Sequence, residues 1–329
     1  MAKLTVFGSA RIDAFLELPD DKANQVCSVD HKNCFIQLSY SAKIPLKRTS
    51  YQVGGNGANV AVGTKRLGID NYLIAELGCG MMADYASKEL AKEIDMKYVT
   101  QSDGVVEGFG AVIVYQGERT ILSYYSPARP PFPPDLPDSE WAYLTSIGDN
   151  FEDFYDEVYS WLGKTNAKLV FNPGGRQIKK GKEWLGKFLQ KCELLMVNRE
   201  EGEEIVVMED SDGKEKELLD ALAQLGAKNV VVTDGMSGSY SKDSSGKYSQ
   251  LGVLPIDSIE RTGAGDSYST GCMSALIKGH SLQEGMLWGT INAASKVGYV
   301  GPQKGLLHED QLDEWVQRAV SSGVAVKEL

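Results

Sequence analysis

The sequence predicts an α/β fold, with a mostly parallel central sheet flanked by helices on both faces and a small additional β-sheet. Three observations predict it. Short strand-like apolar runs alternate with helical periodicity along most of the chain. Some of these runs, such as the three valines at 230–232, are apolar without alternation, as expected for parallel strands covered on both faces. Two stretches without helical periodicity interrupt the order.

The alternating order is that of successive βαβ units, and the last third of the chain becomes helical. The expected strands are 4–8, 72–77, 169–172, 194–197 and 229–233. The expected helices are 57–67, 83–94, a helix through 184–189, a helix through 218–225, and then 264–277, 282–297 and 309–320.

The two interruptions cover about residues 14–50 and 108–126. The second contains a hairpin pattern, with strands at 111–115 and 120–125 and a turn at 116–118. Both follow strands of the core, so they could pair into a small sheet that stands off it. We expect one α/β domain over 1–329 with this sheet as a lid over the ligand edge. An edge decoration or a dimer contact is the alternative.

Composition and charge exclude several classes of protein. The 329 residues include 34 basic and 45 acidic side chains, for a net charge of −11. This balance argues against broad binding to nucleic acid or to membranes, because phosphate affinity needs concentrated Lys and Arg. No stretch approaches the roughly 18 apolar residues of a membrane span, and no signal peptide is recognisable. We expect a cytoplasmic protein.

The cysteines are odd in number and scattered, and no two form a Cys-x-x-Cys pair. We interpret all five as free thiols of a reducing compartment. Cys27 and Cys34, with His31 between them, resemble a metal cluster most closely, but their spacing fits no standard zinc pattern. Surface thiols are the simpler interpretation, and a metal or redox role is the alternative. The five are Cys27, Cys34, Cys79, Cys192 and Cys272.

The clearest chemical signal is a glycine-rich helix start that contains Gly263, Ala264, Gly265 and Asp266. Such a start leaves backbone N–H groups uncovered, and the helix dipole adds positive charge there. The amides of Gly263, Ala264 and Gly265 therefore predict an anion hole. Asp266 could take a proton from a hydroxyl while these amides hold a transferring phosphoryl group. A helix start with a favourable acid and no chemistry is the alternative.

A second glycine-rich segment, at 54–63, is followed by Arg-Leu-Gly at 66–68. Glycines let the backbone approach a polyol closely, and an amide offers both a donor and an acceptor. Together the two segments resemble the two signatures of the ribokinase-like (PfkB) family of ATP-dependent carbohydrate kinases, and the resemblance covers nearly the whole chain. It implies a ribokinase-like fold, with Asp266 as the catalytic base. It also implies a set of acceptor-binding residues, namely Asp13, Gly54, Gly55, Asn56 and Asn59.

The resemblance further implies sites for nucleotide and magnesium. Asn198 and Glu201 match an N-x-x-E motif, in which Asn198 helps to bind the nucleotide phosphates and Glu201 holds Mg²⁺ through water. A solvated acidic helix start is the alternative, since residues 200–204 contain four glutamates. Asn292 matches a position that lines the nucleotide pocket, with a helix-surface role as the alternative. The other implied nucleotide-binding residues are Thr233, Gly235, Gly238 and Thr262.

The chain departs from the family pattern at two places. Glu260 and Arg261 stand where relatives commonly have Asp-Thr, a stretch that belongs to a monovalent-cation site in many members. This departure argues against activation by potassium. Arg261 either places a cation near the phosphates or points to solvent. Asn56 stands where ribokinases have a lysine, which argues against strict ribokinase identity.

The resemblance thus implies transfer of the γ-phosphoryl group of ATP to a sugar hydroxyl, with ATP and Mg²⁺ as cofactors. The apolar strands of the expected lid could pair between subunits, so we expect a homodimer that forms through the lid. A Walker-type kinase is excluded because its G-x-x-x-x-G-K-[ST] loop is absent. A nucleoside is an alternative acceptor, with Phe109, Tyr115 and Tyr124 as candidates for stacking on a base. Arg119 and Arg129 are candidates for binding a sugar acid, or are surface arginines. A non-catalytic sugar- or nucleotide-binding protein is the second alternative.

Overall fold

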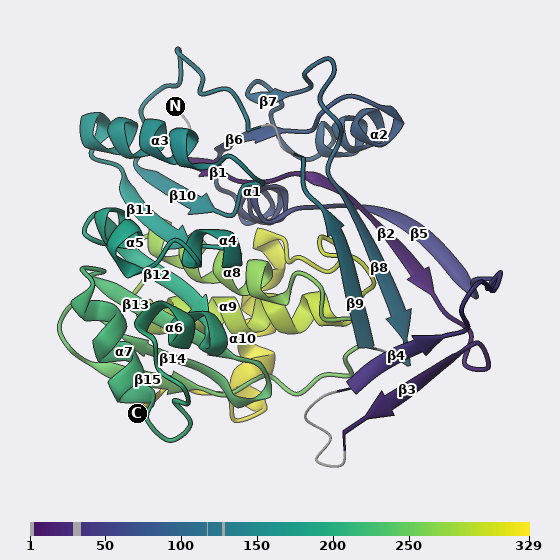
Figure 1. Ribbon diagram of the computed structural model, residues 1–329. Helices are drawn as coiled ribbons and strands as arrows, with labels where there is room; N and C mark the ends of the chain where they lie inside the picture. Colours follow the sequence, from purple (N-terminus) through teal and green to yellow (C-terminus); the bar gives the residue numbers. More distant parts are fainter. Residues whose placement is uncertain (1–2, 29–33, 117, 127–128) are drawn as a thin grey trace.

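The computed structural model describes residues 3–28, 34–116, 118–126 and 129–329, and it places a large sheet between two layers of helices with smaller sheets at one side (Figure 1). Within these residues the large sheet has the strand order β7-β6-β1-β10-β11-β12-β13-β14-β15-β16. Its strands are Leu4–Phe7 (β1), Asn71–Glu76 (β6), Val99–Thr100 (β7), Trp141–Thr145 (β10), Lys168–Asn172 (β11), Cys192–Asn198 (β12), Asn229–Asp234 (β13), Gly238–Lys242 (β14), Tyr248–Leu251 (β15) and Lys327–Glu328 (β16).

The expected mostly parallel sheet is confirmed. β1 pairs in parallel with both β6 and β10, and parallel pairing continues through β11 and β12 to β13. Beyond β13 the sheet becomes antiparallel, because β13, β14 and β15 follow one another through short connections. Neither this antiparallel edge nor strand β10 was expected from the sequence pattern.

Helices cover both faces of the sheet, as expected (Figure 1). The side chains of successive residues in a strand point to opposite faces of the sheet, so they pack against opposite helix layers. Val6 packs in the cluster that includes α1 and α8, whereas Phe7 packs in the cluster that includes α3 and α5. None of the described helices combines the length and apolarity needed to cross a membrane. The helices are Asn56–Arg66 (α1), Met81–Leu90 (α2), Glu152–Thr165 (α3), Gly175–Ile178 (α4), Lys182–Leu189 (α5), Arg199–Val206 (α6), Glu215–Gln224 (α7), Ala264–Ile277 (α8), Leu282–Val297 (α9) and Leu312–Ser321 (α10).

Helices α8 and α9 approach each other closely because glycines lie at their contact. A Cβ atom on Gly271 would lie 2.4 Å from the carbonyl oxygen of Trp288, and one on Gly289 would lie 2.8 Å from that of Tyr268. Larger residues would force the two backbones apart. The glycines therefore hold the first turn of α8, which contains the predicted anion hole, in a defined position against α9.

A separate four-stranded sheet has the order β5-β2-β8-β9. The predicted hairpin is confirmed as the antiparallel pair β8–β9, and its strands join those of the earlier interruption through β2; Gly117 of the predicted turn lies outside the described residues. Because β2 begins four residues after β1 ends, the small sheet starts at the edge of the core (Figure 1). The strands are Arg11–Glu17 (β2), Arg48–Gly54 (β5), Phe109–Tyr115 (β8) and Glu118–Tyr124 (β9).

The prediction of five free thiols is wrong for two of them. The hairpin of β3 (Ala23–Cys27) and β4 (Cys34–Leu38) pairs Cys27 directly with Cys34, and the two form a disulfide. The hairpin register brings them together, and the spacing in sequence does not reveal that register. Cys79, Cys192 and Cys272 are free, and His31 lies outside the described residues.

Candidate active site

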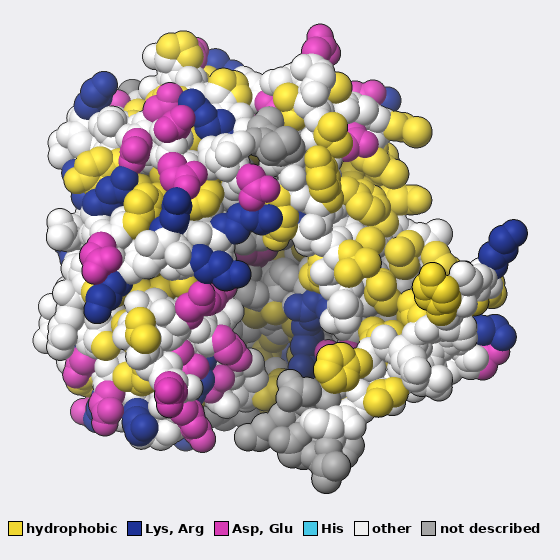
Figure 2. Space-filling model, viewed as in Figure 1, with side chains coloured by type: hydrophobic (Ala, Val, Ile, Leu, Met, Phe, Trp, Pro, Cys, Tyr) yellow, Lys and Arg dark blue, Asp and Glu magenta, His cyan; other side chains and the backbone are white. Residues whose placement is uncertain are grey.

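The predicted site residues gather where the parallel strands end. Asp13 follows β1, Asn198 ends β12, and Thr233 lies near the end of β13. The starts of α1 and α8, which Gly55 and Gly263 cap, face the same region. Ligands of open α/β sheets bind at this edge. Figure 2 shows a hollow between the body of the molecule and the small sheets, with basic side chains inside it.

Asp266 is the central acid of this region. Its Oδ2 atom accepts a 2.7 Å hydrogen bond from Nδ2 of Asn59, and the Oδ1 atom of Asn59 accepts a bond from Gln303. Burial raises the pKa of Asp266 to about 7, although the bond from Asn59 and the charge of Arg11 oppose the rise. A carboxyl group that titrates near neutral pH is suited to general-base catalysis. Asn59 was expected to contact the acceptor, and here it bonds to Asp266 instead; Gln303 was not among the expected site residues.

The start of α8 has the geometry of an anion site with one correction. Gly263 caps the helix at φ 77°, a left-handed conformation that favours glycine, and a Cβ there would lie 2.8 Å from Cβ of Pro302. The amide of Ala264, which was predicted to be free, donates to the carbonyl of Arg261 across a turn at 3.1 Å. The first regular helical bond joins Ser267 to Gly263, so the amides of Gly265 and Asp266 remain in the unbonded first turn.

Asp13 lies in a pocket that glycines open for it. A Cβ on Gly54 would lie 2.3 Å from one Asp13 oxygen, and a Cβ on Gly110 would lie 2.1 Å from the other. Arg11 donates from Nε to Asp13 at 2.8 Å. Burial raises the pKa of the Asp13 carboxyl despite this pairing. Gly110 was not among the predicted site residues, because only the strand register places it beside Asp13. Arg11 was also missed, although it shares a face of β2 with Asp13 two residues later.

Gly55 and Asn56 of the first glycine-rich segment contact the residues that follow β1 and β10. Gly55 has φ 94°, and a Cβ on it would lie 2.5 Å from the carbonyl oxygen of Ser9. Only glycine fits this close approach. Asn56, at the first position of α1, donates to Oγ of Ser146 at 3.1 Å. Gly54 thus lies against Asp13 and Asn59 bonds to Asp266, whereas Gly55 packs on Ser9 and Asn56 bonds to Ser146.

A cavity of about 730 Å³ begins beside the first turn of α8. Thr233, Gly235 and Gly238 line one part of it, and Gly265 and Arg261 line its end near Asp266. Most of its remaining wall is apolar, from the segment 253–256 and from α9. An apolar pocket that ends at a helix N-terminus fits a nucleotide, whose base is apolar and whose phosphates are anionic. Arg261 thus lies at this end, although its side chain is about half exposed.

Three predicted nucleotide-binding residues do not line this cavity, namely Asn198, Thr262 and Asn292. Asn292 is fully buried, and its amide donates to the carbonyl of Ser267 while its oxygen accepts from the amide of Leu307. Both of its polar groups thus join α9 to its neighbours; its contact with the nucleotide stays a prediction that this packing does not favour. Thr262 is also buried, and its hydroxyl has no hydrogen-bond partner among the described residues.

Asn198 and Glu201 form a capping box at the start of α6. The Asn198 side chain accepts from the amide of Glu201 at 2.8 Å, and the Glu201 carboxylate accepts from the amide of Asn198 at 3.0 Å. Burial and repulsion from Glu200 and Glu204 raise the pKa of Glu201, although the bond from the amide of Asn198 opposes the rise. In the parts of the chain that the structure describes, no three His, Cys, Asp or Glu side chains are grouped to hold a metal.

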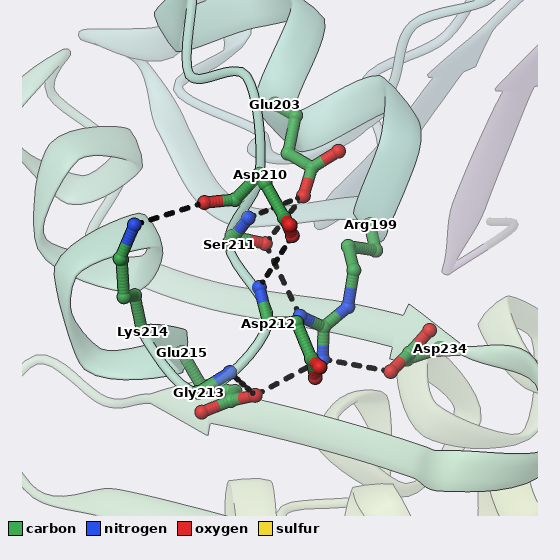
Figure 3. A network of polar contacts seen from close by, with 9 residues as sticks. All are labelled: Arg199, Glu203, Asp210, Ser211, Asp212, Gly213, Lys214, Glu215 and Asp234. Atoms are coloured by element: carbon green, nitrogen blue, oxygen red, sulfur yellow. Dashed lines mark hydrogen bonds and ion pairs between the residues drawn. The ribbon is translucent and has the colours of Figure 1, made fainter.

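Figure 3 shows a polar network around Arg199 that no sequence signal indicated. Arg199, next to Asn198, donates to Asp234 at 2.7 Å and to Glu215 at 3.1 Å. Asp234 directly follows Thr233, and Ser211 bonds to both Arg199 and Glu203. Arg199 therefore links the ends of β12 and β13, which carry two of the predicted phosphate-binding groups.

Comparisons with known proteins agree with this architecture. Residues 23–309 match the family described as pfkB family carbohydrate kinase. The chain belongs to the PfkB family. It is therefore an ATP-dependent phosphotransferase that acts on a sugar hydroxyl.

Relatives and solved structures cover almost the full length. An ATP-dependent 6-phosphofructokinase of Thermoanaerobacterium thermosaccharolyticum is 24% identical, over 86% of this chain and 90% of the relative. A nucleoside kinase of Methanocaldococcus jannaschii is 26% identical, over 86% and 91%. The structure of Arabidopsis thaliana ribokinase with ribose and ATP has a TM-score of 0.76 at 18% identity, over 96% of this chain and 99% of that one. At this identity the structural likeness establishes the ribokinase-like fold.

Breaking the Arg199 network should weaken nucleotide binding. In Arg199→Met, Asp234 and Glu215 lose their shared cation, so the loop that follows β13 loses its attachment to α6. We expect the KM for Mg·ATP to rise on the order of tenfold, with a smaller change in the KM for the acceptor. Steady-state kinetics in both substrates measures this effect.

Lys228→Met is the matched control. Lys228 is well exposed and pairs with Glu193 where β12 and β13 begin, whereas Arg199 and Asp234 pair where these two strands end. It should leave both KM values unchanged. Equal effects of the two substitutions would contradict a specific role for Arg199.

Proposed function

We propose that this enzyme transfers the γ-phosphoryl group of ATP to a hydroxyl of a sugar, with Asp266 as the general base. The observation that carries the proposal is the place of Asp266. It lies at the start of α8, between the end of the nucleotide cavity and the acceptor region around Asp13, and its pKa is raised to about 7. A base at this point is within reach of both reacting groups.

In this mechanism Asp13 and the 54–59 segment hold the acceptor by its hydroxyls. Asp266 takes the proton from the attacking hydroxyl, and Asn59 holds the carboxylate in place. The amides of Gly265 and Asp266, with the dipole of α8, stabilise negative charge on the transferring group. Arg261, at the end of the cavity, adds positive charge near the same position.

Magnesium fits this site as a partner of the nucleotide. Glu201, whose charge acts on Asp266 and which therefore lies near the start of α8, would hold the ion through water. Mg²⁺ commonly binds one or two carboxylates together with substrate phosphates rather than a cage of protein ligands. When bound it would neutralise phosphate charge, and Asn198 would orient the nucleotide phosphates beside it.

Two observations favour a neutral sugar over the alternative acceptors. Gly110 pairs with Asp13, so the two residues lie on the same face of the small sheet. Phe109 is the neighbour of Gly110 in β8 and pairs with Tyr124, so both aromatic side chains lie on the face of the sheet opposite Asp13. Tyr115 is buried and donates to the carbonyl of Ala23. None of these candidates is therefore placed to stack on a nucleoside base. Of the two candidates for binding a sugar acid, Arg129 pairs with Glu157 at 2.6 Å and Arg119 lies 3.9 Å from Glu260.

The test is a coupled assay of ADP release with Mg·ATP across pentoses, hexoses, keto-sugar acids, sugar phosphates and nucleosides. We expect one strong hit among the neutral sugars. Asp266→Asn should lower kcat on that sugar on the order of 10²- to 10⁴-fold, because the base is lost while the shape is kept. Calorimetry should show nearly unchanged ATP binding.

The pH profile provides an independent check of the base. Asp266 must be ionised to accept a proton, so kcat/KM should fall as pH drops below about 7. In Asn59→Ala the lost hydrogen bond no longer favours the carboxylate, and the midpoint should move to higher pH. Near-normal turnover in Asp266→Asn would remove the base assignment. ATP binding without turnover on any acceptor would favour a non-catalytic binding protein.

We also propose that the small sheet is a lid that excludes water. Contacts between β9 and the loop before α8 support it: Arg119 lies 3.9 Å from Glu260, and Glu118 lies 3.9 Å from Arg261. ATP hydrolysis without acceptor should therefore be slow, and ADP release much faster with the right sugar. The coupled assay with and without sugar measures both. Equal rates would rule out gating by the lid.

The same sheet supports a homodimer. Tyr51, Ala14, Ala111 and Leu122 form a row across its four strands, on the face opposite Asp13. Tyr51 and Leu122 at the two ends of the row are about half exposed, and hydrophobic side chains gather over this part of the surface (Figure 2). A second copy of the sheet would cover such a face.

Light scattering should therefore give twice the chain mass of 35.9 kDa. Leu122→Glu should shift the mass to that of one chain, because a charge would be buried in the interface. Val320→Glu is the control, since Val320 is exposed on α10, away from the small sheet. A single chain mass for the unmodified protein at every concentration would contradict the dimer.

A further inference from the structure

A lysine with no exposed surface lies behind the proposed anion hole. Lys296, in the last turn of α9, has a side-chain exposure of 0%. Its Nζ atom donates to the carbonyl oxygen of Glu260 at 2.9 Å and to the Oε2 atom of the same residue at 3.1 Å. Glu260 itself is 3% exposed. Burying an ammonium group costs free energy unless an opposite charge and hydrogen bonds compensate for its lost hydration.

Through Glu260, this ammonium is connected to the loop that enters α8. The Oε1 atom of Glu260 accepts from the amide of Thr262 at 2.5 Å, and its Oε2 atom accepts from the amide of Gly301 at 3.3 Å. Thr262 directly precedes Gly263, the cap of α8. The carboxylate thus joins the entry loop to the segment after α9, and Lys296 balances its charge from the other side.

The local charges show that the site already contains its own cation. Burial alone would raise the pKa of Glu260, but Lys296 and the bonds to Thr262 hold it below its ordinary value. Burial lowers the pKa of Lys296, and the charges of Glu260 and Asp266 oppose that change. Arg119, from the small sheet, is a second cation near this carboxylate, with its Nε atom 3.9 Å from the Oε1 atom of Glu260.

We propose that Lys296 is a positioning residue that supplies a permanent cation behind the anion hole, so that the reaction needs no exchangeable monovalent cation. The family resemblance implies such a cation in many members. The residues present here do not fit one, because the carbonyl and carboxylate oxygens of Glu260 that could bind it already accept from an ammonium group of the chain. The ammonium group of Lys296 therefore gives a physical reason why this chain departs from the monovalent-cation site of its family. The residue types at 260 and 261 alone did not provide that reason.

This inference rests on the proposed function, since it concerns the loop that holds the transferring phosphoryl group. The first experiment needs no variant. The rate of the unmodified enzyme is measured in KCl, NaCl, NH₄Cl and choline chloride at constant ionic strength. The rates should agree within about twofold, the range left for differences in screening. Activation by K⁺ well beyond this range would overturn the proposal.

Two substitutions separate charge from packing. Lys296→Ala leaves a space beside the Glu260 carboxylate, and Lys296→Met fills that space with an uncharged chain of similar length. Both should lose on the order of 10- to 100-fold in kcat, because the loop before α8 shifts. NH₄⁺ or methylammonium should restore Lys296→Ala with saturation, and neither should restore Lys296→Met.

Lys278→Met is the matched control, because Lys278 forms an ion pair with Glu309 at the other end of α8. It should keep the normal rate and show no response to cations. Normal turnover in Lys296→Met would overturn the proposal. So would a loss in Lys296→Ala that no cation restores while the melting temperature is unchanged, because Lys296 would then have only a packing role.

The same series remains informative if no acceptor is found. Calorimetric affinity for Mg·ADP then replaces the rate as the readout. It should be the same in all four salts for the unmodified chain, lower for Lys296→Ala, and restored there by NH₄⁺. A failure of the proposed function would appear as absent turnover in every protein, whereas a failure of the Lys296 proposal would appear as a cation requirement in the unmodified chain or as an unrestored loss in the variant.

Discussion

The hydrogen bond between Asn59 and Asp266 joins the starts of α1 and α8, and the proposed site depends on these two helix ends staying in contact. The helices can approach because Gly63 has no side chain. A Cβ at that position would lie only 2.6 Å from the methyl group of Thr270, so a larger residue would hold the helices apart. The bond also sets the chemistry. Burial favours the neutral acid and the Asn59 amide favours the carboxylate, so one contact affects both the position and the pKa of the base.

Much of this arrangement could be predicted from the sequence because glycine-rich turns are local. The segment around Gly55 and the segment around Gly263 both need positive φ and close backbone contacts, and such needs leave a readable pattern of residues. Alternating strands and helices then imply a parallel sheet, and the carboxyl ends of its strands bring the two segments together. The predicted position of Asp266 followed from these constraints, whereas Asp13 was assigned by its match to the family pattern.

The remaining features depend on contacts between distant segments. Lys296 bonds to Glu260 across 36 residues from within an ordinary helical pattern, and Arg199 was part of a recognised motif without a predicted role. Asn292 matched a family position, but the packing of α9 directs its amide into the core. The Cys27–Cys34 disulfide requires the register of a hairpin. In each case the side chain's direction decides its role, and a motif does not specify that direction.

The balance of charge at the site explains how an acidic chain can bind a polyanion. Arg11 and Lys296 are already paired with Asp13 and Glu260, so they contribute little net charge to a ligand. The positive potential at the phosphate end then comes from the N-terminus of α8 and from Arg261, which lies in the cavity wall. Net charge over the whole chain is a poor guide here, because a few oriented groups determine the local field. The paired Arg11 and Asp13 also leave the acceptor side close to neutral, which suits the hydroxyls of a sugar better than a second anion.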